Sequence, residues 1–245
     1  MLFDMLVSIL MSVLTVEMES PAIGSDPSRL VGTLTAPGQS PDAIGARARP
    51  WAGAVSQPQG TLTMPEVPTI VTREEWGSKP RLPGAKRHKI TRITIHHTGV
   101  AINRARSLED KLRGLQTFSQ RVDKLADGRT KPAWPDIPYH YYISVDGRIG
   151  EARRWRYVGD TNTEYDPTGH LLIVVEGNFE TEKPTPEQLS SLEKLTLWSS
   201  WNWRVPAPML GCHGDFAKTD CPGAALREFM PSLTEMLKKS GYPGQ

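Results

Sequence analysis

The chain has 245 residues, which is enough for one large domain or for a domain with tails. Its formal net charge is only +2, so there is no electrostatic case for nucleic-acid binding. It contains two cysteines, which excludes a small scaffold built on disulfides.

The first residues carry a short apolar run from Met5 to Val16. A helix needs roughly 20 apolar residues to span a bilayer, so this run is too short. Its length suits a signal-peptide core, but Asp4 stands where positive charge is usual and no Ala-x-Ala pattern follows. We expect residues 1–18 to be a signal or hydrophobic N-terminus of an exported protein, with membrane association only if they are retained. The alternative is a frayed amphipathic end or a misplaced start codon.

Between residues 19 and 68 the hydrophobic periodicity disappears. Proline recurs at positions 21, 27, 37, 41, 50, 58, 65 and 68, with glycine between. Such a stretch buries too little apolar surface to offset the entropy of ordering it. It predicts a disordered linker ahead of one folded domain over residues 69–242.

The rest of the sequence predicts strands alternating with helices. Thr72 and Glu75 have the spacing of a capping box, which indicates a short helical turn. Strands are expected over residues 90–97, 139–145, 148–152 and 171–176, with Asp146-Gly147 as a hairpin turn. Helices are expected over residues 104–126, 186–203 and 224–239. This order is typical of an α/β fold with a mixed central β-sheet flanked by helices.

The run GCHGDFAKTDCPG (211–223) brings His213 and Cys221 onto one loop. A histidine nitrogen and a cysteine sulfur together make half of a zinc site. Another element should supply a further ligand, and the strand end ITIHHTG (93–99) offers His96 and His97. Only one of these two can face a given site, because side chains alternate along a strand. Three protein ligands and one open position are typical of a catalytic zinc.

These motifs resemble the zinc-dependent N-acetylmuramoyl-L-alanine amidases, the type 2 amidase family that includes phage-type amidases and animal peptidoglycan recognition proteins. The resemblance runs from about residue 71 to about residue 237 and rests also on TREEWGS (72–78), DIPYHYYISVDGRIGEARRW (136–155) and EGNF (176–179). It implies the fold of that family, Zn²⁺ as the cofactor, and His96 as the third ligand beside His213 and Cys221.

The resemblance also implies a reaction, the hydrolysis of the amide bond between N-acetylmuramic acid and L-alanine in peptidoglycan. Tyr139 matches the catalytic tyrosine of the family, whose hydroxyl orients water or donates to the oxyanion. Thr219 stands where phage-type members carry lysine and animal amidases can carry threonine, so it offers a hydrogen bond without positive charge. Gly214 replaces the usual arginine after the second histidine, a departure that concerns substrate contacts rather than the metal.

A groove for sugar and peptide should present aromatic faces and polar tips. Its expected walls are Arg153, Trp155, Arg156 and Asn162, and His97 is expected to be a neighbouring hydrogen-bonding residue. The expected partner is peptidoglycan or a muropeptide, bound by a monomer, and no nucleic acid is expected.

Two alternatives stay open. The first is a recognition module that binds peptidoglycan without cleaving it; the intact set of His96, His213, Cys221 and Tyr139 argues against this. The second is a disulfide between Cys212 and Cys221 in an exported protein, which would consume a metal ligand.

Overall fold

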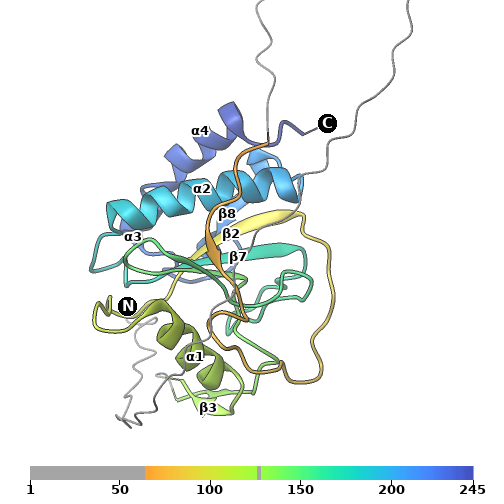
Figure 1. Ribbon diagram of the computed structural model, residues 1–245, viewed down its shortest axis with the longest axis vertical. Coiled ribbons are helices and arrows are strands. Elements are labelled where there is room, and N and C mark those ends of the chain that lie inside the picture. Colours follow the sequence, from red (N-terminus) through yellow and green to blue (C-terminus); the bar gives the residue numbers. More distant parts are fainter. Residues whose placement is uncertain (1–63, 126–127, 245) are drawn as a thin grey trace, which may run out of the picture. The chain divides into compact units, whose positions relative to one another are not determined.

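The computed structural model describes residues 64–125 and 128–244 (Figure 1). The expected N-terminal segment (1–18) and nearly all of the expected linker (19–68) lie outside the described residues, so both stay predictions. Within the described part of the chain, no helix combines the length and the apolar character needed to cross a membrane.

The centre of the fold is a six-stranded mixed sheet in the order β1-β6-β5-β7-β2-β8. Its strands are β1 (Ile70–Val71), β2 (Arg92–His97), β5 (Tyr141–Ile143), β6 (Ile149–Glu151), β7 (His170–Val175) and β8 (Leu210–Cys212). Only β5 and β6 pair antiparallel within it. A separate small ribbon joins β3 (Asp123–Lys124) to β4 (Thr130–Lys131). The expected α/β class and mixed sheet are confirmed.

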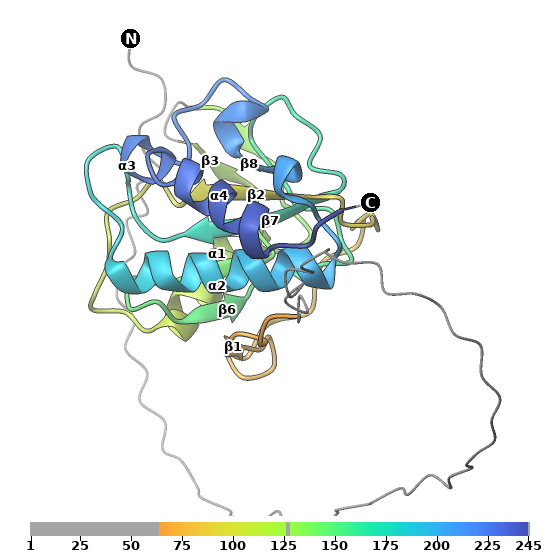
Figure 2. The ribbon, with the colours of Figure 1, turned by 90° about the horizontal axis from the view of Figure 1, so that it is seen from above.

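Helices cover both faces of this sheet. On one face lie α2 (Pro186–Asn202) and α4 (Met230–Ser240), which run side by side in Figure 2. They pack on inward residues of β2 and β7 such as Ile93, Ile95 and Ile173. The other face packs against α1 (Leu108–Ser119) through a smaller core that includes Leu112 and Val174. All six residues of β7 are therefore buried, as expected for a doubly covered strand.

The first helix is shorter than the predicted span of 104–126. It begins after Ser107, whose side chain caps the helix by accepting a hydrogen bond from the Asp110 N–H. It ends at Ser119, because the buried ammonium of Lys131 donates to the carbonyls of Ser119 (3.0 Å) and Arg121 (2.8 Å). The chain then continues into β3, and Val122, expected on the buried stripe, is 65% exposed.

The last predicted helix (224–239) is two helices, α3 (Ala224–Arg227) and α4. The reason is Pro231, which lies in the first turn of α4. Its nitrogen has no hydrogen to donate, and its ring would clash with the carbonyl of Arg227 in a continuous helix. Two short 3-10 helices, Ala207–Met209 and His213–Asp215, flank β8.

Two local predictions from turn chemistry hold. The backbone N–H of Thr72 donates to the Glu75 carboxylate (2.6 Å), and the Glu75 N–H donates back to the Thr72 hydroxyl (3.2 Å). Gly147 adopts φ +79° in the hairpin turn between β5 and β6, a conformation that favours glycine.

The parallel pairing of β2 with β8 brings two distant segments together. Ile95 pairs with Cys212, so His96 follows on β2 at the level where His213 follows β8. The carboxyl ends of these strands therefore bring the two histidines to one edge of the sheet.

Candidate metal centre

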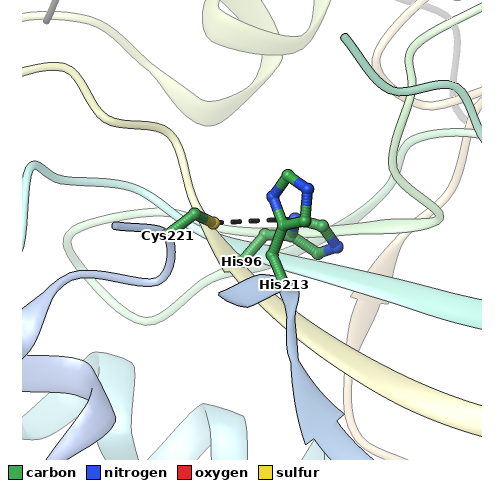
Figure 3. Close-up of side chains that lie close together, drawn as sticks. All are labelled: His96, His213 and Cys221. Carbon is green, nitrogen blue, oxygen red and sulfur yellow. Dashed lines mark hydrogen bonds between the residues drawn. The ribbon is translucent and has the colours of Figure 1, made fainter. Parts of the chain in front are cut away.

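His96, His213 and Cys221 converge at this edge (Figure 3). One nitrogen or sulfur from each residue lies within 4.8 Å of the others, and all three side chains are buried. Nδ1 of His96 is 3.7 Å from the sulfur of Cys221, and the two imidazole rings lie 4.7 Å apart between centroids. A nitrogen, nitrogen and sulfur donor set of this kind suits zinc.

Each donor is held by a different element. His96 pairs with Val174 in register, and Val174 belongs to the core under α1, so the His96 side chain points to that face. His213 begins the turn after β8. Cys221 is folded back toward β2, because its carbonyl accepts from the Gly214 N–H (2.9 Å) and its sulfur accepts from the His97 N–H (3.4 Å).

Burial controls the charge state of His96. Loss of solvent, followed by the proximity of His213, lowers the pKa of His96 well below its ordinary value. The imidazole is therefore neutral at neutral pH and keeps a lone pair for a metal. Its Nε2 is buried and has no hydrogen-bond partner among the described residues. A buried polar atom without a partner is costly, and a bound metal relieves that cost at this cluster, so the three residues fit a zinc ion.

The loop between β6 and β7 adds two residues that sequence reasoning missed. The Thr163 hydroxyl lies 2.7 Å from Nε2 of His213 and also 2.7 Å from the Thr161 hydroxyl. The Tyr165 ring lies 5.1 Å from the His213 ring, and its buried hydroxyl has no hydrogen-bond partner in the described chain. A threonine and a tyrosine in a polar loop carry no periodicity or spacing that could have identified them.

Tyr139 and Thr219 also lie at the centre. The Tyr139 ring is 5.2 Å from the His96 ring, and burial, then the charge of Cys221, raise the pKa of the Tyr139 hydroxyl. The hydroxyl therefore keeps its proton at neutral pH. Thr219 accepts a hydrogen bond from the Cys221 N–H (3.2 Å), which fixes the loop that carries the thiol.

His97 points to the opposite side of β2, as alternation requires. Its ring packs 6.1 Å from the Phe179 ring, and its Nδ1 accepts from the Phe179 N–H (3.3 Å). The structure thus supports the hydrogen-bonding role expected for His97 and places its ring outside the metal cluster.

The expected groove walls are not brought together. Arg153 is only 2% exposed, and its guanidinium donates to the Ile137 and Asp136 carbonyls and pairs with Asp160. Its donors stabilise the interior, so Arg153 does not present its guanidinium to a groove at the metal centre, and this expectation is corrected.

Trp155 and Arg156 lie at the other end of β2. The Trp155 carbonyl is 2.9 Å from Nε2 of His88, and the Arg156 carbonyl accepts from the His88 N–H (3.1 Å). Because His88 precedes the amino end of β2, these two side chains do not wall the metal centre, and this expectation is also corrected. Asn162 alone lies next to the centre, between Thr161 and Thr163.

Comparison with known proteins places this geometry in a family. The family model described as N-acetylmuramoyl-L-alanine amidase matches residues 86–224. The chain belongs to the N-acetylmuramoyl-L-alanine amidase family. An N-acetylmuramoyl-L-alanine amidase of Sus scrofa is 28% identical over 170 residues, which cover 65% of this chain and 26% of that protein. The chain thus spans about a quarter of that relative's length.

Solved structures share the fold of this amidase family. Drosophila peptidoglycan recognition protein SD matches with a TM-score of 0.54 at 25% identity, covering 73% of this chain and 99% of that one. Peptidoglycan recognition protein-LE, in complex with tracheal cytotoxin, matches with a TM-score of 0.56 at 24% identity, covering 66% and 92%.

One departure from the pattern of the amidase family has a visible counterpart. A Cβ at Gly214 would meet the guanidinium end of Arg227, an exposed side chain that would have to turn aside. Arg227 also donates to the Cys221 carbonyl (3.3 Å) and pairs with Asp215 (3.4 Å). Arg227 therefore supplies a cation beside Gly214, the position at which members of the family usually carry an arginine.

The disulfide alternative is wrong for this structure. Neither Cys212 nor Cys221 takes part in a disulfide in the described part of the chain. Cys212 packs in the core under α2 and α4, and burial raises the pKa of its thiol to about 11. Cys221 alone faces the two histidines.

Proposed function

We propose that this chain is a zinc-dependent amidase that hydrolyses the bond between N-acetylmuramic acid and L-alanine in peptidoglycan. The observation that carries the proposal is the convergence of His96, His213 and Cys221 beside the protonated Tyr139. Membership of the amidase family and the name of the pig relative point to the same chemistry.

His96, His213 and Cys221 would hold the metal. Zinc in a site with three protein ligands supplies Lewis acidity that polarises an amide carbonyl and lowers the pKa of water toward about 7. Thr163 orients the second histidine, because a hydroxyl bound to Nε2 fixes the ring and favours coordination through Nδ1. Thr219 does the same for the thiol by holding the backbone of its loop.

Tyr139 is the proton donor of the proposed site. Amide hydrolysis develops negative charge on the carbonyl oxygen, and a fixed hydroxyl beside that atom stabilises the transition state. The raised pKa of Tyr139 keeps the donor protonated across the physiological range. Thr219 cannot supply the positive charge of a lysine. In this proposal the Tyr139 hydroxyl and the Arg227 guanidinium stabilise the negative charge that develops on the carbonyl oxygen.

The proposed substrate is a muropeptide or peptidoglycan strand. A neighbour in structure is described in complex with tracheal cytotoxin, a monomeric diaminopimelic acid-type peptidoglycan. The proposed site of action is the cell envelope or the outside of the cell, and the proposed active form is a monomer.

Incubation with a soluble muropeptide, followed by mass spectrometry of the products, tests the function. We expect a sugar product with a free lactyl carboxylate and a peptide with a free L-alanine amine. A chelator should stop their formation, and added zinc should restore it.

The competing function is recognition without cleavage, which the peptidoglycan recognition protein among the structural neighbours suggests. The threonine at 219 favours it, since a site without the lysine of phage-type members stabilises negative charge less. Binding of the intact muropeptide with zinc present and no product would establish that function instead.

A further inference from the structure

A second charged feature lies apart from the metal centre. The segment 79–92 (KPRLPGAKRHKITR) carries lysine or arginine at positions 79, 81, 86, 87, 89 and 92 and has no acidic residue. All of these cations except Arg92 are exposed. The segment is held against a second basic stretch, residues 153–158 (RRWRYV). The Lys86 carbonyl accepts from the Val158 N–H (2.9 Å), and the backbones of Arg87 and Tyr157 pair in an isolated antiparallel β-bridge.

Between the two stretches lies a cavity of about 350 Å³. Its floor is a buried ion pair between Arg73 and Asp136 (2.8 Å), next to Arg153. Its rim includes the exposed cations Lys79 and Arg81. The site is therefore concave, with a buried ion pair below and exposed cationic side chains above.

Arg81 on the rim and Arg87, on the same segment outside the cavity lining, share the aromatic ring of Tyr157. Arg81 lies 4.5 Å and Arg87 5.9 Å from the Tyr157 ring centroid. A hydrogen bond from Arg87 and the charge of Arg81 lower the pKa of the Tyr157 hydroxyl. The ring thus holds both guanidinium groups in place before any ligand arrives, which reduces the entropy lost on binding.

The acidic residues nearby neutralise other cations. Asp136 pairs with Arg73, Asp160 with Arg153, and Glu74 with Arg154. In the part of the chain that the structure describes, no carboxylate lies within ion-pair distance of Lys79, Arg81 or Arg87. The rim therefore keeps uncompensated positive charge although the whole chain is nearly neutral.

We propose that this rim binds the phosphate groups of a soluble phosphodiester polymer, at a site separate from the metal centre. Guanidinium groups match phosphate oxygens with two parallel hydrogen bonds, and a row of cations matches a repeating anion. Arg81 and Arg87 already lie against the Tyr157 ring, so this ring is not open for the base stacking that single-stranded nucleic acid would use. Among the described rim residues only Leu82 is an exposed large apolar side chain, too little to anchor a membrane surface.

Fluorescence anisotropy with a labelled synthetic poly(glycerol phosphate) oligomer and the full-length chain tests this site. The double variant Arg81→Gln/Arg87→Gln should bind about tenfold more weakly or worse, since two charge-assisted contacts are lost. The slope of log affinity against log salt should fall by about 1.4, because about 0.7 counterion per removed phosphate contact is no longer released. Hydrolysis of a soluble muropeptide should not change.

The matched control is Lys238→Gln/Lys239→Gln, which removes the same charge from α4. It should keep its affinity within about twofold, because both lysines lie on another element and already pair with Glu235 (3.7 and 3.6 Å). A second variant of the segment 79–92, Lys79→Gln/Lys86→Gln, should weaken binding like the arginine pair.

Four results would overturn the proposal. The first is the absence of measurable polymer binding by the wild-type chain, and the second is equal weakening by the arginine and α4 variants. The others are tighter binding of a single-stranded oligonucleotide than of poly(glycerol phosphate), and binding of phosphatidylglycerol vesicles in preference to the polymer.

Discussion

The hydroxyl of Thr163 lies 2.7 Å from Nε2 of His213. This contact joins a loop between β6 and β7 to the residue that follows β8, and the Thr161 hydroxyl continues it at 2.7 Å. The orientation of one proposed zinc ligand is therefore set by a segment 50 residues away in the sequence.

Removing this hydroxyl should weaken the metal site without unfolding it. Thr163→Val keeps the shape of the side chain but loses the hydrogen bond, and loss of such a partner lowers metal affinity by about 10–100-fold. Thr163→Ser should restore most of the affinity. Zinc affinity is measured by competition with a chromogenic chelator, and equal affinity of the valine variant and wild type would rule out the positioning role.

Tyr139→Phe should lower turnover on a muropeptide by about 10²–10³-fold, the effect of one lost oxyanion donor. The phenyl ring keeps its packing beside His96, so zinc content and substrate affinity should change little. Single-turnover rates and equilibrium binding separate the two effects. Turnover at the wild-type rate would make the tyrosine purely structural and leave the role to Thr219 or water.

A buried ion pair supports the loops around β5 and β7. Lys111 Nζ lies 2.8 Å from the Glu176 carboxylate, which also accepts from the N–H groups of Asn103 (3.1 Å) and Val145 (3.0 Å). Lys111→Met should lower the free energy of unfolding by about 3–5 kcal/mol, because it leaves a buried carboxylate without its cation.

The comparison for this pair is Lys238→Met, which breaks an exposed pair with Glu235 and should cost at most about 1 kcal/mol. Urea denaturation of the two variants measures the difference. Similar losses in both would show that burial does not decide the strength of the Lys111 pair.

Acid should destabilise the metal-free protein through its buried histidines. His140 accepts from the Leu172 N–H at Nδ1 (2.8 Å) and contacts the Tyr157 carbonyl at Nε2 (2.9 Å), which fixes a neutral ring. Burial lowers its pKa from 6.5 to about 3. The unfolded chain therefore binds more protons below pH 6.5, so this contribution is present above that pH and is lost as the pH falls toward 3.

His140 alone should contribute a slope of at most about 1.4 kcal/mol of unfolding free energy per pH unit, and about half of that near pH 6.5, where the unfolded ring is half protonated. Burial also lowers the pKa of His170, to about 4, so this residue likewise reduces the free energy of unfolding as the pH falls. Chemical denaturation between pH 7 and about 5 avoids most carboxylate titration. Constant stability over that range would contradict the assignment of neutral, hydrogen-bonded rings.

Periodicity predicted the parts of this structure that depend on burial. The strand that carries His96 and the long α2 follow from alternating and helical apolar spacing, and the buried β7 follows from its nearly continuous apolar run. The order of elements was enough for the α/β class. The helix ends were missed where a distant group intervenes. Lys131 takes the carbonyls that end α1, and no local pattern marks that contact.

The residues of the candidate site also fall into those that the sequence could predict and those that it could not. His96, His213 and Cys221 could be selected because metal ligands have characteristic residue types and spacing. Thr163 and Tyr165 could not, since a loop without periodicity gives no indication of which side chain meets a histidine from another strand. Arg153 was misassigned because a sequence does not distinguish an arginine that faces solvent from one that donates to buried carbonyls.

The relation between bound zinc and turnover tests the central claim most directly. Metal-free protein is titrated with zinc, and muropeptide hydrolysis and zinc content are measured in the same samples. Activity should rise in proportion to zinc and stop at one zinc per chain, while Cys221→Ser should lack both. Hydrolysis that persists without zinc, or one bound zinc per chain without any cleavage, would contradict the account.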